Sequence, residues 1–178
     1  LSKGFVPTKK WKKERFGTSW LVGDTLNVGI GQGFSLATPL QLAVMTARLA
    51  SGKEVIPNLT RNPIKDLEKP KYLSIRSRTL TTIRKGMFDV LNEKEGTAFK
   101  FRSTDENFSI AGKTGTSQVR RITREEREEG VIKNEDLPWK MRDHALFTCF
   151  APYKNPKYAL SVVVEHGGSG SKVAAPIA

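Results

Sequence analysis

The sequence predicts an α+β fold in which helices pack on an antiparallel β-sheet. Two segments with helical spacing come first, and three strand-like segments follow them. The last two, residues 145–151 and 158–164, are separated by a link short enough for a hairpin. No helix separates them, as a doubly wound parallel sheet would require. With 178 residues and 38% hydrophobic content, the chain is about the size of one domain with its own core.

The region before the first helix predicts irregular structure. Residues 1–16 are basic and aromatic, and we expect them to form a solvated or lipid-facing loop. Residues 23–33 carry glycines at close intervals and predict a second loop. Within it, residues 29–33 predict a tight turn.

The first helix has clear start and stop signals. Thr38 suits the N-cap, Pro39 the first helical position, and Gln41 completes a capping box. Gly52 suits the C-terminal end. Between these positions nearly every face is apolar, which is typical of a helix buried at the centre of a domain.

A second helix is predicted to begin near Ser77 and to close at Gly96. Apolar residues recur within it at helical spacing: Leu80, Ile83, Met87, Val90 and Leu91. Residues 53–76, with three prolines, predict a loop that holds an edge strand at most.

A strand is predicted at residues 108–112, with Ser117 and the two residues after it continuing in the same conformation. Residues 119–143 form a long charged insertion. Arg121 with Glu125, and Arg124 with Glu128, would pair one turn apart on a solvated helix.

No metal or organic cofactor is predicted. The single cysteine, Cys149, lies in an apolar strand and suits a buried, inert thiol. His144 and His166 make no metal-ligand spacing with it. A Ser-His-Asp triad drawn through Asp143 and His144 has no evident serine partner, so structural roles at strand ends are preferred.

The net charge is +12. This excess of basic over acidic residues favours anionic partners or reflects an unspecialised basic surface. Nucleic acid is not expected, because no recognised nucleic-acid module surrounds the basic residues. No stretch of about 20 apolar residues predicts a membrane span.

The stretch Gly112-Lys113-Thr114-Gly115-Thr116 carries the strongest chemical signal. Lys113 supplies a cation, Thr114 and Thr116 supply hydroxyls, and Gly115 lets a ligand approach the backbone. We expect it at the tip of a strand, holding an anionic ligand along a sheet edge. K-T-G is one of three signatures of the serine acyl transferases that bind penicillin.

Three other short motifs are weaker. A P-loop would need glycine at Asn107, and a dinucleotide fingerprint would need it at Phe34. Ser169 and Lys172 match S-x-x-K literally. We expect them in a glycine-rich turn rather than opening a central helix, where the lysine would lie beside the hydroxyl.

Several stretches together resemble the C-terminal part of a class B penicillin-binding protein transpeptidase domain, nearest to the elongation-type penicillin-binding protein 2 group. The stretches are Gly23-Asp24-Thr25, residues 29–33, residues 38–43, residues 112–117, residues 137–145, Phe150-Ala151-Pro152, residues 165–171 and residues 174–177. Residues 1–178 would then be the C-terminal portion of one domain of the serine β-lactamase and penicillin-binding fold, with residues 119–143 inserted in it.

This resemblance implies that a serine attacks the D-Ala-D-Ala end of a peptidoglycan stem peptide and passes the acyl group to a neighbouring amine. β-Lactams would trap the acyl-enzyme. Lys113 and Thr116 would be catalytic, the latter through a backbone N–H in the oxyanion hole. Thr114, Gly115 and Thr116 would bind the substrate.

Two family signatures, the S-x-x-K nucleophile and S-x-N, are expected upstream of Leu1. The chain alone is therefore expected to be inactive. The resemblance also implies the periplasmic face of the bacterial inner membrane, with a membrane glycan polymerase and cell-shape proteins as partners. The alternatives are a non-catalytic interaction module, a β-lactamase or carboxypeptidase of the same fold, and a basic nucleic-acid or membrane-surface binder.

Overall fold

The computed structural model describes residues 3–58, 70–120 and 122–178. The chain divides into two compact units, residues 1–41 and 42–178.

The first unit contains two short helices, α1 (Lys9–Phe16) and α2 (Val22–Gly29). The loops predicted for residues 1–16 and 23–33 were therefore wrong where these helices form, over residues 9–16 and 23–29. Local capping explains the difference: the Trp11 amide donates to Thr8 Oγ1 at 3.1 Å, and the Leu21 amide donates to Asp24 Oδ2 at 2.7 Å. The tight turn predicted at 29–33 is present, with Gly31 and Gly33 at positive φ.

Tertiary contacts hold these helices together. Four aromatic rings pack with centroids 4.6–5.5 Å apart: Phe5, Trp11, Phe16 and Phe34. The Lys12 ammonium donates to Asp24 at 2.5 Å and lowers the pKa of that carboxyl. Such packing stabilises helices that are too short to be stable alone.

Helix α3 (Pro39–Ser51) begins and ends as predicted. The Gln41 amide donates to Thr38 Oγ1 and the Thr38 amide donates to Gln41 Oε1, so the capping box is confirmed. Gly52, at φ 70°, closes the helix. The prediction of burial on nearly every face was wrong: within the described residues α3 fully buries Thr46 and Ala50 alone.

Helix α4 (Ser77–Asn92) begins where predicted but ends four residues before Gly96. The Ala98 amide bonds back to the Val90 carbonyl at 3.0 Å, so the chain has already turned when it reaches Gly96. Between α3 and α4, the described residues hold one isolated bridge, Lys53 to Tyr72, in place of an edge strand. Residues 59–69 of that predicted loop lie outside the described residues.

The predicted antiparallel sheet is confirmed. Its order is β1 (Ala111–Ser117), β2 (His144–Ala151) and β3 (Tyr158–Val164). Strand β3 has the predicted bounds, β2 begins one residue earlier than predicted, and the two form the predicted hairpin. Strand β1 starts three residues later than predicted, because residues 106–108 form a 3-10 turn (Glu106–Phe108). The K-T-G residues therefore lie inside a strand, not at its tip.

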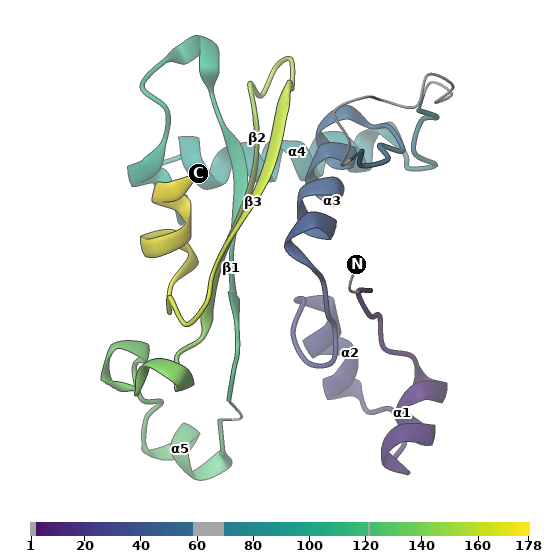
Figure 1. The fold of residues 1–178 in the computed structure, drawn as a ribbon, viewed down its shortest axis with the longest axis vertical. Coiled ribbons are helices and arrows are strands. Elements are labelled where there is room, and N and C mark those ends of the chain that lie inside the picture. Colours follow the sequence, from purple (N-terminus) through teal and green to yellow (C-terminus); the bar gives the residue numbers. More distant parts are fainter. Residues whose placement is uncertain (1–2, 59–69, 121) are drawn as a thin grey trace. The chain divides into compact units, whose positions relative to one another are not determined.

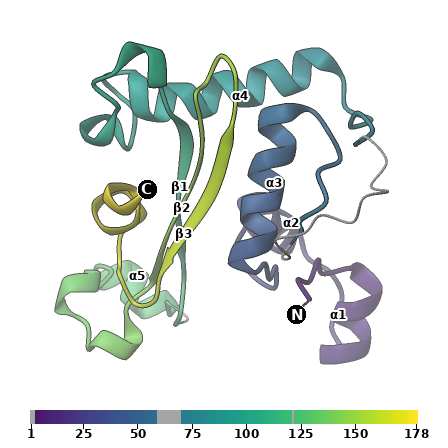
Figure 2. The same cartoon turned by 45° about the horizontal axis from the view of Figure 1, so that its top comes forward.

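Both faces of the sheet are covered (Figures 1 and 2). On one face Phe147 packs in a cluster with Leu91, Ala98 and the C-terminal helical turns, a π-turn (Gly170–Ala174) and a 3-10 turn (Ala175–Ile177). On the other face Phe150 packs with Ala50, Met87 and Ala111. The remaining 3-10 turns are Phe99–Phe101, Asn134–Asp136 and Trp139–Met141.

The charged insertion is a folded lobe with a short helix, α5 (Arg124–Glu129). The predicted Arg124–Glu128 pair is confirmed at 2.9 Å, whereas Arg121 lies outside the described residues. A second pair was not predicted: Arg120 holds Glu126 through two bonds of 2.5 and 2.6 Å. At the base of the lobe, Asp143 accepts from the Val119 amide and from Asn134.

Candidate active site

The candidate site follows the outer side of β1. Within the described residues β1 pairs with β2 alone, so its other side is a sheet edge. The register places Lys113 opposite Thr148 and Thr114 opposite Phe147. Because side chains alternate along a strand, Lys113 and Thr114 belong to opposite faces of the sheet. A ligand lying along the edge can therefore meet groups from both faces.

Lys113 provides the positive charge of this edge. Its side chain is exposed, and its ammonium donates to the Thr114 carbonyl at 2.7 Å. Among the described residues, no carboxylate lies within ion-pair distance of Nζ. Within the described ranges the charge is thus not paired with a carboxylate, and it is available to an anion.

Thr114 has a hydrogen-bond partner from a distant part of the chain. Its hydroxyl lies 3.2 Å from the hydroxyl of Thr97, which follows α4. Thr116, two residues further along β1, lies opposite Ala145 and is exposed. The four predicted site residues from Lys113 to Thr116 therefore share one accessible strand edge, and the structure adds Thr97 to them.

Two glycines allow the close packing around this strand. A Cβ at Gly112 would stand 2.6 Å from the Phe147 ring and 2.8 Å from the Thr148 carbonyl. A Cβ at Gly170 would overlap the Gly115 carbonyl and stand 2.5 Å from that of Leu146. The first C-terminal turn therefore rests directly on the backbone of the K-T-G segment.

Helix α4 is tied to the start of the same strand. The Asn92 side-chain amide donates both to the Phe88 carbonyl at 2.8 Å and to the Ile110 carbonyl at 2.9 Å. Sequence reasoning missed Asn92, Thr97 and Gly170. Their contacts join segments far apart in the chain. No local motif marks Asn92 or Thr97, and Gly170 was noted only as part of the stretch 165–171, without its contact to β1.

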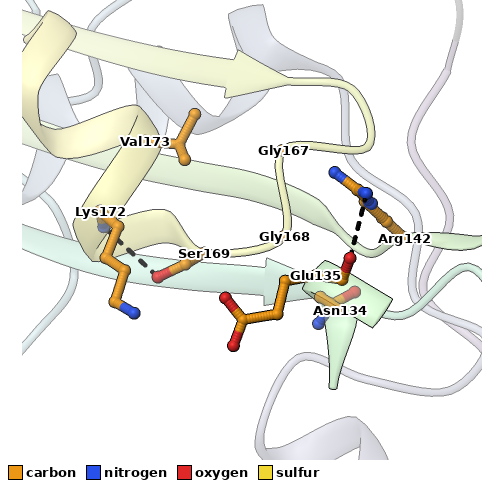
Figure 3. A pocket seen from close by; sticks show the side chains of 8 residues that line it. All are labelled: Asn134, Glu135, Arg142, Gly167, Gly168, Ser169, Lys172 and Val173. Atoms are coloured by element: carbon orange, nitrogen blue, oxygen red, sulfur yellow. Dashed lines mark hydrogen bonds between the residues drawn. The ribbon is translucent and has the colours of Figure 1, made fainter. Parts of the chain in front are cut away.

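The S-x-x-K residues line a separate pocket of about 340 Å³ at the end of the sheet (Figure 3). Ser169 is the N-cap of the π-turn, so the predicted glycine-rich turn was wrong in detail: a helical turn begins there. The Ser169 hydroxyl accepts from the backbone amide of Lys172 at 3.3 Å. Within the described residues, the side-chain ammonium of Lys172 makes no hydrogen bond to the Ser169 hydroxyl. The motif therefore lacks the geometry that activates a serine.

The histidines have structural partners. His144 Nδ1 accepts from the His166 amide at 2.9 Å, and the His166 ring nitrogen lies 2.9 Å from the Arg142 carbonyl. Asp143 bonds to the insertion instead of to a histidine. These contacts support the predicted structural roles.

Cys149 is 3% exposed, and burial raises the pKa of its thiol to about 11. The prediction that this thiol is buried is confirmed. Across the described ranges, no group of three acidic, histidine or cysteine side chains could hold a metal ion. No helix in the part of the chain that the structure describes has the length and apolar character to cross a membrane.

Comparison with known proteins adds two kinds of finding. Residues 3–178 match the family model of the penicillin binding protein transpeptidase domain. Peptidoglycan D,D-transpeptidase MrdA from Haemophilus influenzae is 38% identical over 182 residues, which cover 97% of this chain and 27% of that protein. The Escherichia coli K12 protein of the same name is 34% identical, with 96% and 28% covered.

Solved structures give the same result. The complex between penicillin-binding protein PBP2 and MreC from Helicobacter pylori matches with a TM-score of 0.80 at 38% identity, covering 98% of this chain and 29% of that one. Pseudomonas aeruginosa PBP2 in complex with WCK 5153 matches with a TM-score of 0.72 at 35% identity, covering 99% and 36%. The chain spans less than a third of the length of these curated relatives. It belongs to the penicillin-binding protein transpeptidase domain family.

Proposed function

We propose that residues 1–178 form the C-terminal portion of a peptidoglycan D,D-transpeptidase domain, with residues 119–143 as an insertion in it. The observation that carries the proposal is the exposed Lys113, which pairs with no carboxylate of the described residues, on a sheet edge next to two threonines. Relatives named as D,D-transpeptidases at 34–38% identity support it.

In this proposal a serine outside residues 1–178 attacks the carbonyl of the penultimate D-alanine of a stem peptide. The C–N bond to the terminal D-alanine breaks, and that residue leaves with its amine protonated. The acyl group then passes from the serine to an amine of a neighbouring stem. β-Lactams acylate the same serine as in the first step. They stay attached to it, because their leaving amine remains tethered to the acyl-enzyme.

The strand supplies binding and charge in this reaction. Lys113 gives positive potential beside the nucleophile, and the Thr114 and Thr116 hydroxyls donate to the substrate carboxylate. Gly115 lets the substrate backbone lie close to the strand. The Thr116 N–H donates to the oxyanion; removing one such donor typically costs about 3 kcal/mol of transition-state stabilisation.

Location and partners follow from the relatives. We propose that the longer protein works at the periplasmic face of the bacterial inner membrane. The Helicobacter pylori PBP2 was solved with MreC, which supports a cell-shape partner of that kind here. A membrane glycan polymerase is the second partner that we propose.

Labelling with fluorescent penicillin tests this proposal. Residues 1–178 alone should stay unlabelled, whereas the full-length protein and its Ser169→Ala variant should label equally. Stoichiometric labelling at Ser169 would overturn the assignment of the nucleophile. Labelled protein that releases a hydrolysed stem peptide without forming cross-links would favour the carboxypeptidase or β-lactamase alternative.

Full-length protein that binds neither penicillin nor stem peptides would favour a non-catalytic interaction module. Binding to DNA or anionic vesicles that falls steeply with salt would indicate the basic-surface alternative. Each result separates the transpeptidase from one competing class.

A further inference from the structure

The Thr97–Thr114 contact joins the turn that follows α4 to the K-T-G strand. The two hydroxyl oxygens lie 3.2 Å apart, and 17 residues separate them in sequence. Thr114 is part of the predicted substrate edge, whereas nothing in the motif assigns a role to Thr97.

The backbone around Thr97 is firmly placed. The amide of Ala98 donates to Val90 in α4 at 3.0 Å, and the amide of Gly96 donates to Glu93 at 2.9 Å. Ala98 is 1% exposed in the core cluster that includes Phe147. Thr97 thus stands between two anchored residues, and its hydroxyl reaches Thr114 from a fixed backbone.

The number of available protons decides which of the two threonine hydroxyls donates to the other. A hydroxyl has one proton to donate, and an ionised carboxylate can only accept. If the Thr114 hydroxyl donates to a substrate carboxylate, the Thr114 hydroxyl oxygen can still accept a hydrogen bond. Among the described residues, the Thr97 hydroxyl is placed to donate it. Thr97 O–H then donates to Thr114, and Thr114 O–H donates to the carboxylate, a chain in which each bond polarises the next.

We propose that Thr97 is a positioning residue for substrate-carboxylate recognition. It orients the Thr114 hydroxyl so that its proton points to the ligand along the edge of β1. This inference rests on the proposed function, since it assigns Thr97 to the carboxylate contact of the same site.

The test compares penicillin with its methyl ester on the full-length protein. The ratio of acylation rates for acid over ester measures carboxylate recognition. Thr97→Val keeps the shape and removes the donor, and should lower this ratio about 3- to 10-fold, the range expected for one hydrogen bond. Thr97→Ser keeps the hydroxyl and should restore the ratio.

A merely structural role would slow acid and ester equally and leave the ratio unchanged. That result, or an unchanged ratio together with unchanged rates, would overturn the inference. In a Thr114→Val background, Thr97→Val should have no further effect, and an additive effect would also overturn it. Wild-type protein that neither compound acylates would instead contradict the proposed function, and this inference with it.

Discussion

Gly170 lies directly against Gly115, so that a Cβ at residue 170 would overlap the Gly115 carbonyl. The neighbouring obstacle is the Leu146 carbonyl at 2.5 Å. Both obstacles are backbone atoms in the middle of a paired sheet and cannot move independently. The C-terminal turn and the K-T-G strand therefore hold each other in place.

Gly170→Ala should destabilise the full-length protein by about 1–3 kcal/mol, the usual cost of overpacking. It should also slow acylation by penicillin, because β1 must shift to relieve the overlap. Thermal unfolding and the rate of fluorescent-penicillin labelling measure the two effects.

Gly86→Ala is the matched control for that substitution. Gly86 lies within α4, and a Cβ there meets nothing within 4 Å. Alanine should raise stability slightly, by about 0.5–1 kcal/mol, through its better helix propensity. Equal effects of the two substitutions would contradict the packing argument.

Lys113→Met should slow acylation about 10²- to 10³-fold, as expected for loss of one preorganised charged group at the reaction centre. The melting temperature should change little, because the side chain is exposed. Lys172→Met removes an exposed lysine of the S-x-x-K match and should leave acylation unchanged. A strong loss of acylation in the Lys172→Met variant would indicate that the S-x-x-K match takes part in the reaction.

Glu126 should make the insertion sensitive to acid. Arg120 holds the pKa of this carboxyl at about 2, below its ordinary value of 4.5. A group whose pKa is depressed on folding stabilises the fold above its unfolded pKa, and the contribution is lost as the pH falls from 4.5 towards 2. Protection of the Ile132 amide, which donates to Glu126 at 3.2 Å, should fall over that range.

Hydrogen exchange, corrected for intrinsic rates, measures this protection. Glu126→Gln should reduce it at neutral pH and abolish its dependence on acid. Glu128→Gln is the control, because the Arg124–Glu128 pair is largely exposed and such pairs contribute little. An acid transition that persists in Glu126→Gln would place its origin elsewhere.

Cys149 should resist alkylation in the native state. Burial keeps its pKa near 11, so at pH 8 the reactive thiolate is scarce and shielded. Iodoacetamide should modify Cys149 only after denaturation, as peptide mass spectrometry can follow. In a Thr81→Cys variant, the new thiol on the exposed face of α4 should react rapidly in the same sample.

The sequence predicted best where the signal is local. Capping residues predicted both ends of α3, and the strongly apolar runs predicted the bounds of β3 and, to within one residue, those of β2. The K-T-G strand was also identified, because its residue types are specific. The end of α4 and the start of β1 were predicted less accurately, because turns form near Gly96 and at residues 106–108.

The remaining features depend on contacts between distant segments. Helices α1 and α2 form around an aromatic cluster and the Lys12–Asp24 pair, neither of which has a periodic pattern. The exposed faces of α3 could not be foreseen from its composition. Thr97 and Gly170 gain their meaning only from where the chain places them beside β1.

Gly112 shows that one residue of the motif stretch is set by packing alone. Its missing side chain leaves room for the Phe147 ring, 2.6 Å from where a Cβ would stand. A smaller residue at position 147 would not make room for a side chain at position 112, because the Thr148 carbonyl, a backbone atom, would stand 2.8 Å from the same Cβ. Glycine at position 112 is therefore required by the pairing of β1 with β2, away from any substrate, whatever ring or smaller group occupies position 147.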